Sequence, residues 1–279
     1  MSASLPTRPL SHALGAEIMH VDLTSPVPTE LFAQIRSIWV DNLVALVRGQ
    51  NGLTPDSHLA FSRQFGTLDP NDSSPEYRLD GYPDVLEITN KPKPGGQPSP
   101  TREAGRKWHS DLEFTLEPTM ASLLWCGQLP DVGGDTMFAN MYMAYDELSA
   151  GLKRTLATMH VVFPVPPALL ELGTPYNKVA QPVVRTHPES GRKSLFISQR
   201  ASHFEGWSQE ESKPLLQYLC AHATQAEFVY RHRWVPGDLL IWDNRCTLHQ
   251  ALGDYDRQQI RYMRRTSVKG SPSGYVASS

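Results

Sequence analysis

Short apolar runs, separated by turn-forming residues, recur along most of the chain. They cover residues 43–47, 84–89, 121–126, 135–139, 239–242 and 260–268. Runs of this length, bounded by glycine and proline, are typical of buried strands rather than of helices. Residues 226–234 alternate aromatic and other side chains, as a strand with one buried face does. The pattern predicts many short strands and therefore a chain that is mainly β.

Four segments carry a helical pattern instead. The apolar residues of segment 29–39 fall at helical spacing, and Thr29 is a candidate N-cap. Thr54, which precedes a proline, opens a second helix, and Ser208, three residues before a glutamate, forms a capping box for a third. Residues 141–156 favour one or two further helices. A few helices inserted among many short strands favour a double-stranded β-helix, or jelly roll.

The length of the chain and one unusual loop define its organisation. A mainly β chain of 279 residues commonly forms one domain, so we expect a single domain over residues 1–279. Residues 90–107 are rich in proline, glycine and polar side chains and have almost nothing to bury. Long loops in compact domains often serve as lids or binding loops. We expect a mobile lid at 90–107, with a flexible excursion of no functional consequence as the alternative.

Composition and charge argue against several classes of protein. The net charge of −3 does not fit a nucleic-acid-binding surface, which needs a basic stripe. No stretch has the apolar length of a membrane helix, and residues 1–9 lack the apolar core of a signal peptide. The cysteines at 126, 220 and 246 are far apart, as reduced thiols in a cytosolic protein are. We expect a cytoplasmic protein that binds neither nucleic acid nor membrane.

The first candidate for chemistry is a histidine and an aspartate near the middle of the chain. His109 and Asp111 are two residues apart in segment 107–114, and if this segment is a strand they project from the same face. A distant histidine, His249, would complete a set of two histidines and one carboxylate. Such a set holds Fe(II) and leaves positions open for substrate and dioxygen. Two alternatives stay open here: a zinc hydrolase with the same three residues, and a jelly-roll binding module without catalysis.

The last predicted strand, residues 260–268, carries three arginines: Arg261, Arg264 and Arg265. In a strand, Arg261 and Arg265 face one side and Arg264 faces the other. A keto acid that chelates a metal needs a cation for its far carboxylate, and the planar fork of arginine matches a carboxylate. A zinc hydrolase would not need this pair of arginines.

Four motifs occur in a characteristic order: His109-x-Asp111, the Gly133–Thr136 stretch, the Trp242–His249 stretch and Arg261-x-x-x-Arg265. This order resembles the taurine / 2,4-D dioxygenase family (TauD/TfdA), whose members are Fe(II)- and 2-oxoglutarate-dependent dioxygenases. The resemblance extends over nearly the whole chain, from residues 14–17 to residues 265–266. It implies a jelly-roll fold, Fe(II) as the metal, 2-oxoglutarate as cosubstrate and O2 as oxidant. The cosubstrate would leave as succinate and carbon dioxide.

The resemblance also assigns roles to individual residues. It implies three ligands to Fe(II): His109, Asp111 and His249. Thr136 and Arg261 would bind the far carboxylate of 2-oxoglutarate, and Arg265 would bind an anionic group of the substrate. The gap between His249 and Arg261 is a residue longer than in taurine dioxygenase. If the insertion is placed elsewhere, Arg264 competes for these roles.

The same resemblance, with the arginines, favours a small anionic substrate: a carboxylate, sulfonate, sulfate ester or aryloxyalkanoate. Hydroxylation of an amino acid derivative or a natural-product intermediate is the alternative within the family. Ala201 stands where taurine dioxygenase has an aromatic residue, which argues against taurine itself. We also expect a homo-oligomer, either a dimer or a tetramer.

Several residues are candidates for contact with the substrate. Trp242 would line the pocket near the iron, with packing as the alternative interpretation. Asn90 would contact the substrate, with turn formation as its alternative. Arg106, Lys107 and Arg200 are further cations that could meet an anionic group.

Overall fold

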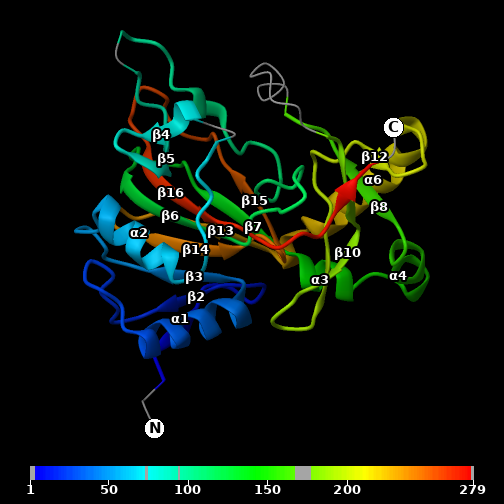
Figure 1. Cartoon of the computed structure of the whole chain (residues 1–279), viewed down its shortest axis with the longest axis horizontal. Helices are drawn as coiled ribbons and strands as arrows, with labels where there is room; N and C mark the ends of the chain where they lie inside the picture. The colour runs from blue at the N-terminus through cyan, green and yellow to red at the C-terminus, as the bar shows by residue number, and fades with distance from the viewer. Residues whose placement is uncertain (1–3, 73–74, 94, 167–176, 278–279) are drawn as a thin grey trace.

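An eight-stranded sheet, here called the main sheet, occupies one half of the molecule (Figure 1). The computed structural model describes residues 4–72, 75–93, 95–166 and 177–277. The strands of the main sheet lie in the order β1 (Thr7–Pro9), β2 (Ala16–Ile18), β3 (Val44–Val47), β14 (Leu239–Asp243), β6 (Ala121–Gln128), β16 (Tyr262–Val268), β5 (Tyr82–Thr89) and β4 (Arg78–Leu79). Neighbours are antiparallel except for the parallel pair β2 and β3. Strands from both ends of the chain therefore lie side by side.

The central strands are buried on both faces. Every residue of β3 and of β14 is buried. In β3, Ala45 and Val47 pack in the cluster that contains the apolar faces of helices α1 (Thr29–Asn42) and α2 (Pro55–Arg63), whereas Val44 and Leu46 pack in the cluster that contains Phe138. Successive side chains of a strand point to opposite faces. A strand covered on both sides can therefore be a continuous apolar run, which is the pattern at 43–47.

A smaller sheet packs on the face of the main sheet away from α1 and α2. It consists of β13 (Val229–His232), β7 (Thr136–Asn140) and β15 (Thr247–Ala251), with β7 in the centre. Phe138 of β7 packs with Leu240 and Trp242 of β14 across the gap between the sheets. Two packed antiparallel sheets with inserted helices confirm the predicted jelly roll.

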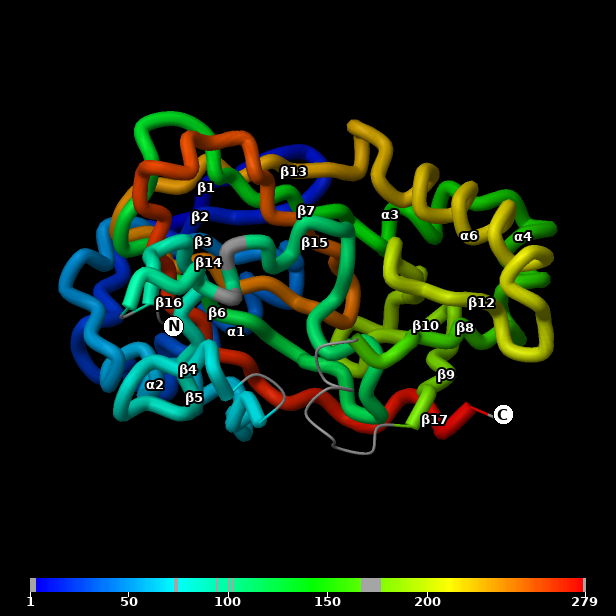
Figure 2. Tube along the Cα trace, turned by 90° about the horizontal axis from the view of Figure 1, so that it is seen from above, coloured from blue at the N-terminus to red at the C-terminus, as the bar shows by residue number. Residues whose placement is uncertain are grey.

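The remaining elements form the other half of the molecule (Figures 1 and 2). A four-stranded sheet has the order β12 (His203–Phe204), β8 (His160–Phe163), β9 (Val179–Pro182) and β17 (Tyr275–Val276), and a hairpin pairs β10 (Val184–Thr186) with β11 (Lys193–Leu195). The helices of this half are α3 (Met141–Asp146), α4 (Ala150–Leu156) and α6 (Gln209–Ala223). Three short 3-10 helices complete the described elements: η1 (Pro75–Tyr77), η2 (Pro100–Glu103) and η3 (Ala226–Phe228).

Local predictions hold where a capping residue or an apolar run determines the element. The predicted cap at Thr54 and the predicted capping box at Ser208 are both present and start α2 and α6, and Thr54 also forms a capping box with Ser57. The N-cap prediction at Thr29 is wrong, because Pro28 occupies that position and Thr29 is already helical. The strand predicted at 107–114 is also wrong: His109 forms an isolated bridge, and a turn follows it. Among the described residues, no helix combines the length and apolarity needed to cross a membrane.

Candidate metal centre

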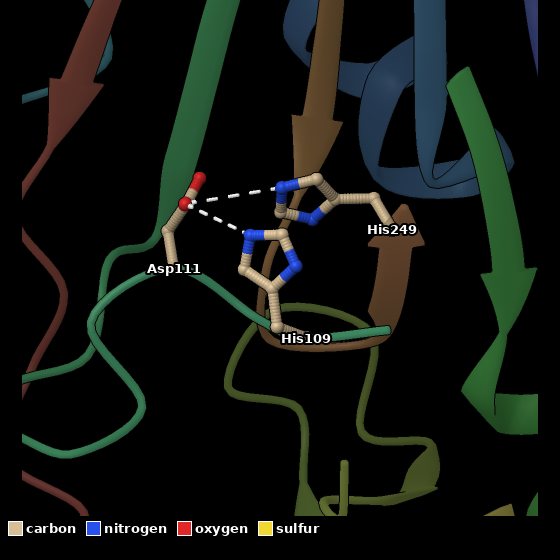
Figure 3. Close-up of side chains that lie close together, drawn as sticks. All are labelled: His109, Asp111 and His249. Atoms are coloured by element: carbon tan, nitrogen blue, oxygen red, sulfur yellow. Dashed lines mark ion pairs between the residues drawn. The ribbon is translucent and has the colours of Figure 1, made fainter. Parts of the chain in front are cut away.

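Three buried side chains converge between the two sheets of the jelly roll (Figure 3). The Nε2 atoms of His109 and His249 each lie 3.8 Å from Oδ1 of Asp111. The two imidazole rings are 4.1 Å apart between centroids. One nitrogen from each ring and one carboxylate oxygen thus surround a common point, as ligands of a transition metal do.

A cross-strand pair, and not a single strand, brings the two histidines together. The backbone N–H of His109 donates to O of His249 (3.1 Å), and the N–H of His249 donates to O of His109 (2.9 Å). Residues that exchange both hydrogen bonds stand directly opposite each other, so their side chains leave the same face. Asp111 follows in a turn in which Leu112 has φ 53°. The convergence of the three residues was predicted, but the strand alternation expected to align His109 with Asp111 is absent, because segment 107–114 is not a strand.

Hydrogen bonding prepares His109 to act as a metal ligand. Nδ1 of His109 lies 2.7 Å from O of Lys107. Since a carbonyl oxygen only accepts, Nδ1 carries the proton and Nε2 presents a lone pair toward Asp111 and His249. Burial lowers the pKa of His109 well below its ordinary value and that of His249 to about 4. Both rings are therefore neutral near pH 7, which is the form that binds metals.

Packing holds the second histidine. The ring of His249 lies 4.8 Å from that of Trp242 and stacks on that of Phe138 at 6.1 Å, both measured between centroids. Its Nδ1 is buried and has no hydrogen-bond partner among the described residues. Trp242, which was predicted to line the substrate pocket, is only 2% exposed and supports His249 from behind. The packing interpretation of Trp242 is the one that the geometry supports.

A hydrogen-bond network fixes the carboxylate. Oδ1 of Asp111 accepts from Nη1 of Arg265 (2.9 Å), and Oδ2 accepts from Oγ of Ser122 (2.7 Å). Asn244 donates from Nδ2 to Oγ of Ser122 (3.0 Å), and its Oδ1 accepts from the backbone N–H of Asp111 (3.2 Å) and from Nε1 of Trp242 (3.0 Å). Burial raises the pKa of Asp111, but Arg265, the two histidines and Ser122 together hold it well below its usual range. The carboxylate is therefore charged and oriented.

The sequence carried no signal for Ser122 and only a general one for Asn244. As part of the Trp242–His249 stretch, Asn244 was expected to support the ligands or to form a turn, and its bonds to Asp111 and Ser122 give it the supporting role. Ser122 lies in the apolar run of β6 and carried no signal of its own. Only the pairing of β6 with β14 brings the two residues together.

A buried arginine lies at the end of the small sheet beyond His249. Nε of Arg261 donates to O of Gly134 (3.0 Å), and its side chain lines a small pocket with Ala251, Leu252 and Tyr255. Arg261 is 6% exposed, and no carboxylate of the described residues pairs with it. Burial lowers the pKa of its guanidinium, so an anion in this pocket would be strongly favoured. Gly134, at φ 74°, permits the approach, because a Cβ there would lie 3.2 Å from Cδ of Arg261.

Thr136 lies at the same end of the sheet. It pairs across strands with Ala251, which lines the pocket of Arg261, and its Oγ1 accepts from Nε1 of Trp234 (3.0 Å). The Thr136 hydroxyl hydrogen is therefore available to an acceptor. The predicted pair of Thr136 and Arg261 is thus brought to one end of β7 and β15.

The other predicted residues fall in different places. Arg264 points away from the pocket of Arg261. Its guanidinium lies 4.0 Å from the centre of the Trp125 ring and donates to O of Leu53, so Arg264 does not compete with Arg261. The prediction that Asn90 contacts substrate finds no support in the geometry. Its side-chain Oδ1 accepts from the backbone N–H of Arg261 (2.8 Å), and its Nδ2 donates to O of Gln259 (2.8 Å). Asn90 positions the arginine instead.

Comparison with known proteins gives a consistent result. Residues 6–267 match the family model described as "Taurine catabolism dioxygenase TauD, TfdA family". The chain is 35% identical to an α-ketoglutarate-dependent 2,4-dichlorophenoxyacetate dioxygenase of Cupriavidus pinatubonensis, over 95% of this chain and 98% of that one. It is 31% identical to an α-ketoglutarate-dependent sulfate ester dioxygenase of Pseudomonas putida, over 95% and 90%. Among solved structures, AAD-2 in complex with Mn(II) and N-oxalylglycine superposes with a TM-score of 0.87 at 30% identity, over 97% and 99%.

Proposed function

The chain belongs to the TauD/TfdA family of α-ketoglutarate-dependent dioxygenases, and we propose that it hydroxylates a small anionic substrate with Fe(II) held by His109, Asp111 and His249. One observation carries the proposal. Two imidazole nitrogens and a charged carboxylate oxygen face a common point, and at the end of the same small sheet lies a buried arginine that pairs with no carboxylate of the described residues. A metal and a dicarboxylate are the ligands that such a pair of sites accommodates.

The protein residues have distinct tasks around these ligands. When bound, Fe(II) supplies the activation of dioxygen that converts 2-oxoglutarate (α-ketoglutarate) to succinate and carbon dioxide while a substrate C–H bond is hydroxylated. Arg261 and Thr136 bind and orient the far carboxylate of the cosubstrate. Asn90 holds the backbone of Arg261, and the Gly134 carbonyl holds its Nε. Trp242 and Phe138 keep water from the inner side of His249.

The charge of the site supports an anionic substrate. The relatives act, by their names, on 2,4-dichlorophenoxyacetate and on sulfate esters, both of which are anions. Arg265 donates to Asp111 and therefore contributes one positive charge beside the metal position. We propose a carboxylate, sulfonate, sulfate ester or aryloxyalkanoate as the substrate. The predicted contact of Arg265 with that anion stays a prediction.

Segment 90–107 is proposed to cover the cosubstrate end of the site within a single domain. Its described part is fixed at several points: Oγ1 of Thr101 accepts from the backbone N–H of Thr89 (2.9 Å), O of Gly105 accepts from the N–H of Ala251 (2.8 Å), and O of Arg106 accepts from Nε2 of Gln250 (2.7 Å). The first bond connects the segment to β5 and the other two connect it to β15, beside the pocket of Arg261. The predicted homo-oligomer and cytoplasmic location stay predictions.

The test is a substitution in the proposed cosubstrate pocket. We expect Arg261→Ala to raise the 2-oxoglutarate concentration for half-maximal succinate release by about 10- to 100-fold, the value of charge-assisted hydrogen bonds. Fe(II) binding should be unchanged, since Arg261 does not contact the ligands. The matched control is Arg63→Ala, an exposed arginine paired with Asp84. An unchanged saturation curve in Arg261→Ala would remove the assignment.

A further inference from the structure

The segment 198–200 is hydrogen-bonded directly to the metal motif. The backbone N–H of Gln199 donates to O of Trp108 (3.1 Å), and the N–H of Trp108 donates to Oε1 of Gln199 (3.1 Å). Oγ of Ser198 donates to Oε1 of Glu113 (3.0 Å). Three bonds thus connect this segment to residues on both sides of His109 and Asp111. The side chain that follows, Arg200, is therefore beside the metal centre although it is distant in sequence.

Glu113 orients Arg200 but does not occupy the hydrogen-bond donors of its guanidinium. Glu113 is 1% exposed, and its two oxygens accept hydrogen bonds from the N–H of Ser110 (3.1 Å) and from Ser198. Nη1 of Arg200 lies 4.0 Å from Oε1 of Glu113, the outer limit of an ion pair. The backbone N–H of Arg200 donates to Oγ of Ser198 (3.0 Å), which fixes the start of the side chain. The fork of the guanidinium is not engaged in a two-bond contact with Glu113.

The three arginines of the site differ in their exposure to solvent. About a third of the Arg200 side chain is exposed to solvent (33%), whereas the Arg265 side chain is 21% exposed and donates to Asp111. Arg261 is buried in its own pocket. Of these three cations, Arg200 is the one that a solute arriving from solvent meets most readily.

We propose that Arg200, oriented by Glu113, binds the oxyanion group of the substrate and thereby selects anionic substrates. The inference rests on the proposed function and adds a specificity residue to it. A guanidinium fork matches the paired oxygens of a carboxylate, sulfonate or sulfate. Charge recognition by Arg200 holds the substrate at the metal centre while Arg261 holds the cosubstrate.

The experiment compares Arg200→Gln and Arg200→Lys with the wild type. The probes are 2,4-dichlorophenoxyacetate, its uncharged methyl ester and an alkyl sulfate ester, and the control variant is Arg63→Gln at an exposed site. For the anionic probes, we expect Arg200→Gln to raise KM by about 10- to 100-fold and Arg200→Lys to raise it less. The half-saturating 2-oxoglutarate concentration and the KM of the uncharged probe should stay within about a factor of two, well below the value of one charged hydrogen bond.

A binding measurement makes the test independent of turnover. The same variants are loaded with Mn(II) and N-oxalylglycine, and the Kd of each probe is measured by calorimetry. The Kd of the anionic probes should rise by the same factor as KM. The two anionic probes also distinguish carboxylate from sulfate recognition, because the true class loses more affinity in Arg200→Gln.

Two results would overturn the proposal. An unchanged KM and Kd for the anionic probes in Arg200→Gln shows that Arg200 does not bind the anion. An equal loss for the charged and uncharged probes shows that Arg200 acts through shape alone. If the wild type releases no succinate with any of the probes and does not bind 2-oxoglutarate, the proposed function itself has failed and the role of Arg200 falls with it.

Discussion

Among the described residues, two buried clusters of three possible metal ligands each contain a histidine and an aspartate, and only one leaves its ligand atoms free for a metal. The first is His109, Asp111 and His249; the second is His187, Asp243 and Cys246. In both, the three possible ligand atoms lie within 4.8 Å of one another, and all residues are buried. Residue type, burial and proximity therefore do not distinguish them.

The two clusters differ in the hydrogen bonds that Nδ1 of the histidine makes. Nδ1 of His187 accepts from the N–H groups of Glu189 (3.3 Å) and Ser190 (3.1 Å), so the proton is on Nε2, which donates to Oδ2 of Asp243 (3.0 Å). In His109 the order is reversed, because Nδ1 donates to a carbonyl and Nε2 is left with its lone pair. A protonated nitrogen cannot bind a metal. The second cluster is a structural pair, and the first can receive an ion.

The carboxylates differ in the same way. Each oxygen of Asp243 accepts two hydrogen bonds: Oδ1 from the backbone N–H (2.9 Å) and Nε (2.8 Å) of Arg245, and Oδ2 from Nη2 of Arg245 (2.6 Å) and from His187. Burial raises the pKa of Cys246 well above its ordinary value, which keeps the thiol protonated. Asp111 has a single bond to each oxygen, and Oδ1 also faces both Nε2 atoms. A metal site is therefore recognised by ligand atoms that still have lone pairs not used in hydrogen bonds.

The largest expected difference comes from removing one histidine of each cluster. His249→Ala should lower Fe(II) affinity by more than about 100-fold, since loss of a ligand exceeds the 10- to 100-fold cost of losing a supporting residue. His187→Ala should leave metal affinity and stoichiometry unchanged. Anaerobic equilibrium dialysis with Fe(II) measures both. Loss of metal binding in His187→Ala would show that the second cluster, not the first, holds the ion.

Folding stability, in contrast to Fe(II) binding, is expected to depend on the second cluster. Asp243→Ala removes the partner of Arg245 and His187 and should lower the free energy of unfolding by about 3–5 kcal/mol, the cost of breaking a buried ion pair. Urea unfolding followed by circular dichroism measures the change, and the folded fraction should still bind Fe(II) as the wild type does. A stability within error of the wild type would contradict the structural role of this cluster.

Removing a residue that supports Asp111 should have an effect of intermediate size on Fe(II) affinity. Ser122→Ala removes the bond to Oδ2 of Asp111, and we expect it to weaken Fe(II) binding by about 10- to 100-fold through loss of orientation. The matched control is Ser62→Ala, a buried serine that bonds with Thr266 and does not contact the ligands. Equal Fe(II) affinities in the two variants would remove Ser122 from the site.

The smallest effect concerns a buried histidine outside both clusters. Burial, with a contribution from Arg264, lowers the pKa of His58 to about 3, whereas its unfolded value is near 6.5. The unfolded chain then binds more protons than the folded one between these values, so stability is lost as pH falls from about 6.5 toward 3. His58→Gln should reduce the slope of unfolding free energy against pH in this window by about 1 kcal/mol per pH unit. Denaturant unfolding at several pH values measures it, and an unchanged slope would mean that His58 titrates normally.

Much of the fold followed from local sequence signals. The apolar runs at 43–47 and 239–242 correspond to β3 and β14, and the predicted cap at Thr54 and capping box at Ser208 start their helices. These features depend on neighbouring residues and on burial, both of which leave a pattern in the sequence. The family resemblance supplied the rest, and the match to the TauD/TfdA model confirms it.

The details of the site did not follow, because they depend on contacts between distant residues. A backbone bridge between segments that are far apart in sequence places His109 and His249. The turn after Asp111 contains Leu112 at a positive φ, a conformation that leucine rarely adopts and that the sequence therefore does not predict. The bonds of Ser122 and Asn244 to Asp111 arise from the packing of β6 beside β14. Periodicity carries no information about such contacts.

Anaerobic addition of Fe(II) and then 2-oxoglutarate to the protein tests the central claim most directly. A chelate of ferrous iron with a 2-oxo acid absorbs weakly in the visible range, so the wild type and His187→Ala should both develop this band, saturating at one Fe(II) per chain. His249→Ala should not. A wild type without the band, or a band that persists in His249→Ala, would contradict a ferrous 2-oxoglutarate site at His109, Asp111 and His249.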